Sequence, residues 1–339
     1  MSLTPDILFH RAVAGRHPGG LADLDAQDAD SRWSLSPGEL QVLRLVRESL
    51  NGALSSALPN ELHCDTAPLY FNYIDTTAVT TEAFASETHS LIGMSVPMAT
   101  AVMRRASRVG ASKDVRQALT LPQLSASTDH GPLAVALLTL LFIASHEYCH
   151  HVLGHLRATL QPDDPRRAPL RGRLQSQTAE LAADGYAGMY LLEHAVRGDF
   201  RAVLVEMFGL DAGNEARCDR CLFLAVLVAV AATWFGTPPH VLDEHGIYQL
   251  PHPPRAVRLS SYMRHATLWA ARSSSLADVI NQQGFANLIY LAGLAAGDAS
   301  QHADARQQHV FMRSSEGRAY LKVLYDNLDL RKSLMGTYQ

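Results

Sequence analysis

The chain has 339 residues, of which 47% are hydrophobic, enough for one large domain or two with an ample core. Its formal net charge is −4 and it has no lysine-rich run, which argues against a nucleic-acid partner. Four scattered cysteines are too few for a disulfide framework, and residues 1–16 lack the charged-then-apolar layout of a signal peptide. We therefore expect a cytoplasmic protein.

Residues 1–66 are expected to form a helical and irregular segment before the main domain. Residues 1–32 are rich in Asp, Ala, Gly and His, and we expect them to be loosely ordered. Ser36-Pro37-Gly38-Glu39 has the serine-to-glutamate spacing of a capping box and predicts a helix start. The helix that follows has apolar residues at helical spacing: Leu40, Val42, Leu43, Val46 and Leu50.

Residues 67–265 are expected to form the main domain, which opens with strands. Three apolar segments separated by small polar turns have strand character: 69–74, 79–84 and 90–96. The helical pattern returns from Pro97. The sequence therefore predicts a small sheet ahead of a helical region.

An apolar stretch opens with Gly131-Pro132 and runs without a break into His146-Glu147-Tyr148-Cys149-His150. Glycine and proline suit a helix start, Gly154 is the expected stop, and apolar residues on every side indicate a buried helix. Histidines four residues apart lie on one face of a helix, so His146 and His150 can bind one zinc ion. Glu147 can act as general base on a water that the metal activates. The alternative is a buried helix whose histidines only find hydrogen-bond partners.

A catalytic zinc site needs a third protein ligand. The HExxHxxGxxH scheme fails, because Leu153 and Leu156 occupy its glycine and histidine positions. Glu180 and Asp184 share a face of a later helix, so Glu180 can bind the metal while Asp184 accepts the N–H of a ligand histidine. The alternative is an ordinary surface pair on an amphipathic helix.

These residues make the chain resemble the gluzincins, zinc metallopeptidases with HExxH on one helix and a glutamate ligand on the next. The ExxAD form from Glu180 to Asp184 is similar to the branch of the CAAX prenyl peptidases and their soluble relatives. Size and motif spacing also resemble the bacterial phage-exclusion peptidases. The resemblance covers about residues 70–260 and implies an α+β, mainly helical fold. It implies a zincin-like core, with a small mixed sheet beside the HExxH helix and a following glutamate-ligand helix.

The segment His252-Pro253-Pro254-Arg255-Ala256-Val257-Arg258 resembles the His-Pro-Pro…Arg segment of the same branch. The resemblance implies that His252 helps to hold the developing oxyanion. It also implies that Arg258 orients the site through a carboxylate such as Asp184. A solvated loop is the alternative interpretation of this segment.

Peptidases of this class pair an extended substrate with a sheet edge beside the zinc. Main-chain hydrogen bonds along such an edge give affinity with little sequence demand. The candidate for this edge consists of Leu91, Ile92, Gly93 and Met94. The alternative is a purely structural strand.

Several other features are expected to be structural. His151 and His155 are left out of the ligand set because they lie off the ligand face or a turn further on. The 158–175 region is proline-rich and charged, which favours a mobile linker over a gate. Cys218 and Cys221 form a lone CxxC with too few soft ligands nearby for a second zinc.

Residues 266–339 are helical in texture and are expected to pack on the core in one compact unit. The core candidates in this region are Tyr290, Leu291, Leu294, Leu321 and Leu324.

The expected function is a soluble zinc endopeptidase with one Zn²⁺ per chain, acting on a protein or peptide, with a bacterial regulatory or phage-defence role. One alternative is an integral membrane zinc peptidase. The apolar run before His146 is about 12 to 14 residues and Cys221–Phe235 is about 15, both shorter than the roughly 18 to 20 that span a bilayer. The other alternative is a catalytically silent zinc-stabilised interaction protein, against which the presence of Glu147 argues.

Overall fold

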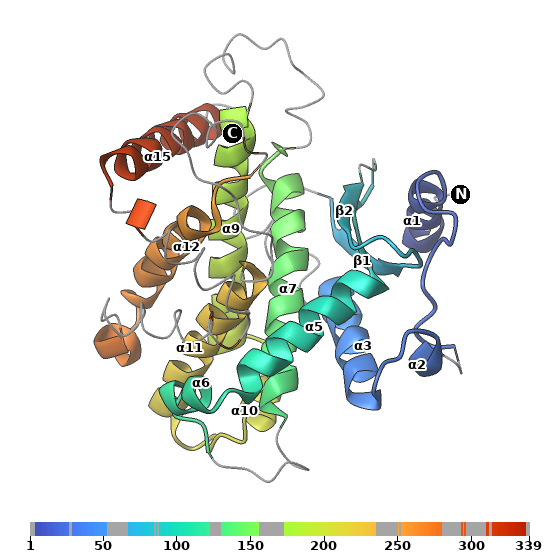
Figure 1. Cartoon of the computed structure of the whole chain (residues 1–339), viewed down its shortest axis with the longest axis horizontal. Helices are drawn as coiled ribbons and strands as arrows, with labels where there is room; N and C mark the ends of the chain where they lie inside the picture. The colour runs from blue at the N-terminus through green and yellow to red at the C-terminus, as the bar shows by residue number, and fades with distance from the viewer. Residues whose placement is uncertain are drawn as a thin grey trace.

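The computed structural model describes residues 4–26, 29–52, 67–122 except 85 and 87, 130–155, 173–234, 250, 252–279 and 314–336, with positions 293, 295, 310 and 311. The first half contains α1 (Pro5–Ala14), α2 (Ala29–Arg32), α3 (Pro37–Asn51), β1 (Leu69–Ile74), β2 (Thr81–Phe84), β3 (Ser90–Ser95), α5 (Val96–Ala111) and α6 (Lys113–Ala118). The second half contains α7 (Gly131–Val152), α9 (Arg173–Val196), α10 (Arg201–Met207), α11 (Glu215–Trp234), α12 (Arg255–Ala270), the 3₁₀ helix η3 (Ser274–Val279) and α15 (Ser315–Gly336). The chain is mainly helical with a small mixed sheet (Figure 1), as an α+β fold requires.

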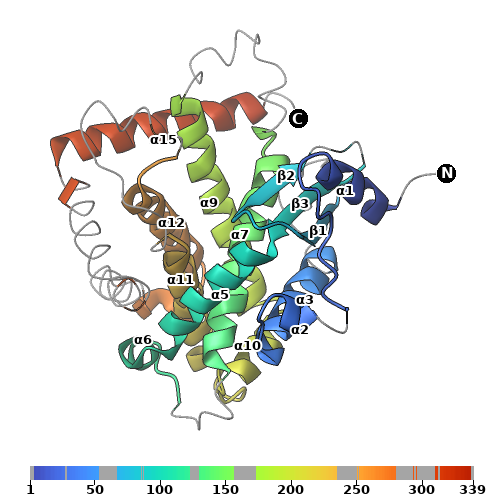
Figure 2. The same ribbon diagram turned by 45° about the vertical axis from the view of Figure 1, so that its right-hand side comes forward.

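Helix α1 packs beside the sheet (Figure 2), so the expectation of loose order in residues 1–32 is wrong for this part of the chain. Phe9 and Val13 lie one turn apart and are fully buried in a cluster with Ile74. A bridge from Leu21 to Ile74 attaches the segment after α1 to β1. The amino-acid composition did not predict that α1 is ordered. Its apolar face is short and becomes buried only against a sheet that is distant in sequence.

Helix α3 begins at the predicted capping box. The Ser36 hydroxyl accepts from the Glu39 N–H at 3.2 Å, and Glu39 accepts from the Ser36 N–H at 2.7 Å. All five apolar residues predicted for this helix are buried. At its other end the Asn51 side chain donates to the Phe71 carbonyl and accepts from the Phe71 N–H, which fixes the helix against β1.

The sheet has the order β1-β3-β2, with β1 parallel and β2 antiparallel to β3. Strand β3 is therefore central among the described strands, and Ile92 is flanked by Phe71 on one side and Ala83 on the other. This corrects the expectation that Leu91, Ile92, Gly93 and Met94 form a substrate-binding edge. Their main-chain groups already pair with strands on both sides, so no extended peptide can be added there.

Helix α7 lies at the centre of the molecule, with α9, α11 and α12 on one side and α5 and the sheet on the other (Figure 1). It packs against α3, α5, α9, α11, β2 and β3. Because its sequence is apolar on nearly every face, burial by many elements is the arrangement that removes it from water.

The motif residues continue α7, so the helix has 22 residues and is longer than its apolar run. By length and composition it is able to cross a membrane, which corrects the expectation that the run is too short. However, 83% of its most apolar window is buried inside the protein. Burial of this kind is consistent with the core helix of a soluble protein.

Helices α9 and α12 approach closely at two glycines. A Cβ at Gly185 would lie 2.8 Å from the His265 ring, and one at Gly188 would lie 2.0 Å from Tyr262. The C-terminal helix α15 covers α9 through a cluster that contains Leu181, Val257, Tyr320 and Leu324. The expected core positions Tyr290, Leu291 and Leu294 lie outside the described residues, whereas Leu324 is buried and Leu321 packs partly buried against the same cluster.

Candidate metal centre

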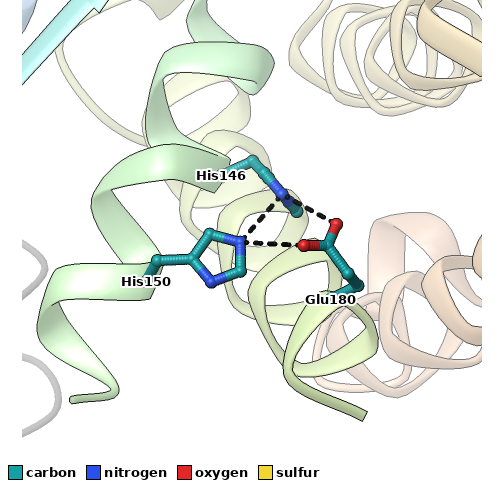
Figure 3. A group of neighbouring side chains, drawn as sticks. All are labelled: His146, His150 and Glu180. Carbon is teal, nitrogen blue, oxygen red and sulfur yellow. Dashed lines mark hydrogen bonds and ion pairs between the residues drawn. The ribbon is translucent and has the colours of Figure 1, made fainter. Parts of the chain in front are cut away.

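Helices α7 and α9 lie side by side and bring His146, His150 and Glu180 together (Figure 3). The Nε2 atoms of the two histidines are 3.1 Å apart. Each lies 3.4 Å from one carboxylate oxygen of Glu180. His146 and Glu180 are each 7% exposed and His150 is half-buried. One donor atom from each residue lies within 4.8 Å of the others, so these three residues form a buried group able to hold a metal ion. Two imidazole nitrogens and a carboxylate form a ligand set that suits zinc.

Asp184 and Arg258 lie behind this group. Asp184 is fully buried one turn after Glu180, and its Oδ1 lies 2.9 Å from Nδ1 of His146. Arg258 of α12 donates to both Asp184 oxygens at 2.7 Å, and its Nη2 lies 3.2 Å from Glu180. Asp184 thus lies within reach of a ligand histidine, as the residue spacing predicts, and of Arg258, as the family resemblance implies. The carboxylate can therefore hold the His146 proton on Nδ1 and leave Nε2 free for a metal.

Burial by itself would raise the pKa of the Glu180 and Asp184 carboxyl groups. Arg258, together with hydrogen bonds from the ligand histidines, instead holds the pKa of Glu180 well below its usual value. Arg258 and His146 likewise lower the pKa of Asp184. Both carboxylates are therefore ionised at neutral pH despite their burial, as a cation-binding group requires.

The pKa of His146 shifts in the opposite direction. Burial would lower its pKa, but Asp184 and Glu180 outweigh that effect and raise the pKa of the metal-free imidazole to about 10. Without a metal, the cluster therefore carries its positive charge on His146 and on Arg258, whose pKa the same two carboxylates raise.

Glu147 follows the candidate ligand His146 on α7, and His252 lies at the margin of the group. Glu147 is half-buried on α7, and its charge contributes to the raised pKa of Arg258. Nδ1 of His252 lies 3.3 Å from Oε2 of Glu180, and the His252 side chain is 55% exposed. The structure thus places His252, Asp184 and Arg258 beside the three residues able to hold a metal, and these six residues come from three separate segments.

Two further histidines follow His150, and they point in different directions. Burial, together with the nearby His150, lowers the pKa of His151 to about 4, and the backbone of Leu91 in β3 opposes this shift. Nδ1 of His155 lies 2.7 Å from Nδ1 of His150. Sequence reasoning missed this contact. The only available signal was Gly154, whose positive φ of +66° turns the chain at the end of α7.

Two other predictions concern regions away from the group. Cys218 and Cys221 are buried, unpaired in disulfides and part of the core on α11. Within the described part of the chain they belong to no group of metal-binding side chains. Most of the 158–175 region lies outside the described residues, and α9 begins at Arg173.

Comparisons with protein-family models, with curated proteins and with solved structures find no match. Any functional assignment therefore depends on the geometry and chemistry of this site.

Proposed function

We propose that the chain is a zinc-dependent endopeptidase of the gluzincin type, which hydrolyses a peptide bond in a protein substrate. One observation carries this proposal. Glu147 is a carboxylate on the same helix as two ligands, and it lies outside the group of three residues able to hold the metal. A structural zinc usually has four protein ligands and needs no nearby base, whereas a catalytic zinc has three and keeps one position open.

In this proposal His146, His150 and Glu180 hold the ion, and a bound zinc ion supplies Lewis-acid activation of water and of the substrate carbonyl. Glu147 accepts a proton from the attacking water and later delivers it to the leaving amine. His252 donates to the oxygen on which negative charge develops, and its half-exposed side chain beside Glu180 suits that role. Asp184 and Arg258 hold the ligands in place and take no part in proton transfer.

The sheet suggests where a peptide could bind. Strand β2 pairs with β3 on one side, and no described strand pairs with its other side. Strand β2 also packs against α7, the helix that carries His146 and His150. We therefore assign substrate addition to β2, with Thr81–Phe84 replacing the β3 residues as the strand that offers main-chain hydrogen bonds.

The decisive experiment compares new protein termini produced by the wild type and by Glu147→Gln. The variant should bind zinc as the wild type does and should cleave nothing, because only the proton acceptor is lost. Glu206→Gln is the matched control, since Glu206 is exposed on α10 away from the site. New termini from the control together with none from Glu147→Gln support the proposal. Full cleavage by Glu147→Gln contradicts it.

The same experiment addresses the biological role. A cytoplasmic regulatory or phage-defence role stays a prediction that the identity of the cleaved protein decides. Substrates from the translation or replication machinery would support it, whereas secreted or envelope substrates would argue for a different role.

A further inference from the structure

The two ring nitrogens of His150 face different neighbours. Its Nε2 lies 3.1 Å from Nε2 of His146 and 3.4 Å from Glu180, so this nitrogen faces the metal group. Its Nδ1 lies 2.7 Å from Nδ1 of His155. A neutral imidazole that binds a metal through Nε2 carries its proton on Nδ1, and that N–H requires an acceptor. Asp184 lies within hydrogen-bond distance of Nδ1 of His146, whereas the neighbour of Nδ1 of His150 is His155.

We propose that His155 is the positioning residue for the metal ligand His150. Nδ1 of His155 accepts the N–H of His150 Nδ1, which fixes the ring angle of His150 and keeps its Nε2 free of a proton. Because an accepting nitrogen cannot carry a proton, His155 is the tautomer with its proton on Nε2. The two ligand histidines thus have different supports, a carboxylate for His146 and an imidazole for His150.

The local backbone brings His155 to this place. Helix α7 ends at Val152, and the Leu153 N–H still donates to the Cys149 carbonyl at 2.9 Å. Gly154 then adopts a φ of +66°, a conformation that glycine takes without the steric cost of a side chain. The turn folds His155 back onto the helix, where it is 6% exposed and its ring lies edge-to-face with His150 at 4.8 Å between centroids.

His155 is a support and not a fourth ligand. The atoms of the metal group lie around Nε2 of His150, whereas His155 contacts Nδ1 on another side of the ring. His155 is also absent from the group whose donor atoms lie within 4.8 Å of one another. The inference rests on the metal-binding part of the proposed function and is independent of peptide cleavage.

The first test measures zinc affinity by competition with a chelator. His155→Leu removes the acceptor and should weaken zinc binding about 10- to 100-fold, whereas His155→Gln supplies an amide oxygen and should restore most of the affinity. His130→Leu is the matched control, because His130 is exposed at the start of the same helix. Wild-type affinity in His155→Leu, or equal losses in His155→Leu and His155→Gln, would overturn the inference.

The second test needs no variant at position 155 and so avoids any folding defect there. Nitrogen-15 spectra of the zinc-loaded full chain should show His150 protonated on Nδ1 and His155 protonated on Nε2. A proton on Nδ1 of His155 would overturn the inference.

Normal zinc binding without cleavage would remove the peptidase assignment alone. Unchanged affinity in His155→Leu would remove only the role of His155, and a wild type that takes up no zinc would overturn both.

Discussion

At the scale of single residues, the pair Asp184 and Arg258 determines whether the metal group can exist in the protein interior. Asp184 has no exposed surface, and its charge is balanced by a guanidinium that contacts both carboxylate oxygens at 2.7 Å. Arg258 also lies 3.2 Å from Glu180, so a single cation serves two buried carboxylates. Such a pair contributes little net stability compared with apolar residues, but the loss of one partner leaves a buried charge uncompensated.

The first prediction follows from the cost of leaving a buried charge without its partner. Arg258→Met should lower the free energy of unfolding of the metal-free protein by about 3–5 kcal/mol, measured by urea denaturation. Arg264→Met, on the same helix, is the control. Its guanidinium is exposed over the Tyr325 ring, so its loss should cost about 1 kcal/mol or less. Equal effects of the two substitutions would contradict the assigned role of Arg258.

The second prediction concerns protons. Burial opposes protonation of His146, but Asp184 and Glu180 raise its pKa to about 10 in the metal-free protein. A raised pKa means that His146 is protonated below that pH, so zinc must displace a proton and zinc affinity should increase as the pH rises towards 10. Calorimetric titrations at pH 8 in two buffers of different ionisation enthalpy should show release of about one proton per zinc. Asp184→Asn should reduce that release, and zinc binding with no proton release would contradict the prediction.

Residue spacing predicted the metal group well and its surroundings less well. The i,i+4 pairs His146–His150 and Glu180–Asp184 lie on single helices, so their relative placement follows from helix geometry alone. The approach of Arg258 to Asp184 came from a family resemblance, because the two residues lie on different helices. The contact of His155 with His150 depends on the left-handed turn at Gly154, which the ligand spacing does not encode.

At the scale of elements, the packing of α12 against α9 delivers Arg258 to the site. Gly185 and Gly188 leave room on α9 for the rings of His265 and Tyr262. Asp184 precedes the first of these glycines and Arg258 lies one turn before Tyr262, so the close approach of the two helices is next to the contact between Asp184 and Arg258. The backbone spacing of α9 and α12 therefore sets the geometry behind the metal ligands.

The third prediction tests this coupling. Gly188→Ala would place a Cβ 2.0 Å from Tyr262, so α12 must move away from α9. We expect a loss of about 1–3 kcal/mol in unfolding free energy from overpacking, together with weaker zinc binding because Arg258 moves with α12. Gly15→Ala is the control, since its Cβ would meet nothing within 4 Å and its φ is −71°. Unchanged stability and unchanged zinc affinity in Gly188→Ala would show that the two helices are not coupled in this way.

The existence of each helix and strand was easier to predict from the sequence than which elements pack or pair beside it. The capping box, the apolar periodicity and the glycine stop placed α3 and α7, because each signal acts within a few residues. The order β1-β3-β2 could not be read in the same way. Strand β3 is buried along its whole length, and a strand without an alternating exposed face does not reveal which partners flank it.

At the scale of the whole molecule, a metal ion would connect α7 with α9, and through Asp184 it would also be coupled to α12. The fourth prediction is that zinc stabilises the folded chain by mass action, by about 2.7 kcal/mol at a free zinc concentration 100 times the Kd. A chelator should lower the Tm of the zinc-loaded wild type. The Tm of Glu180→Ala should respond much less, because one of the three ligands is missing. Equal responses of the two proteins would exclude Glu180 as a ligand.

The central position of α7 also has a consequence for how a metal could leave. Backbone amides in a buried core helix exchange with solvent mainly when the whole molecule unfolds. His146 and His150 lie on the last turns of that helix, whereas Glu180 belongs to α9 and His252 is half-exposed. The two histidines should therefore stay in place during partial opening, and the rate of metal loss should depend on motions of α9 and of the segment around His252.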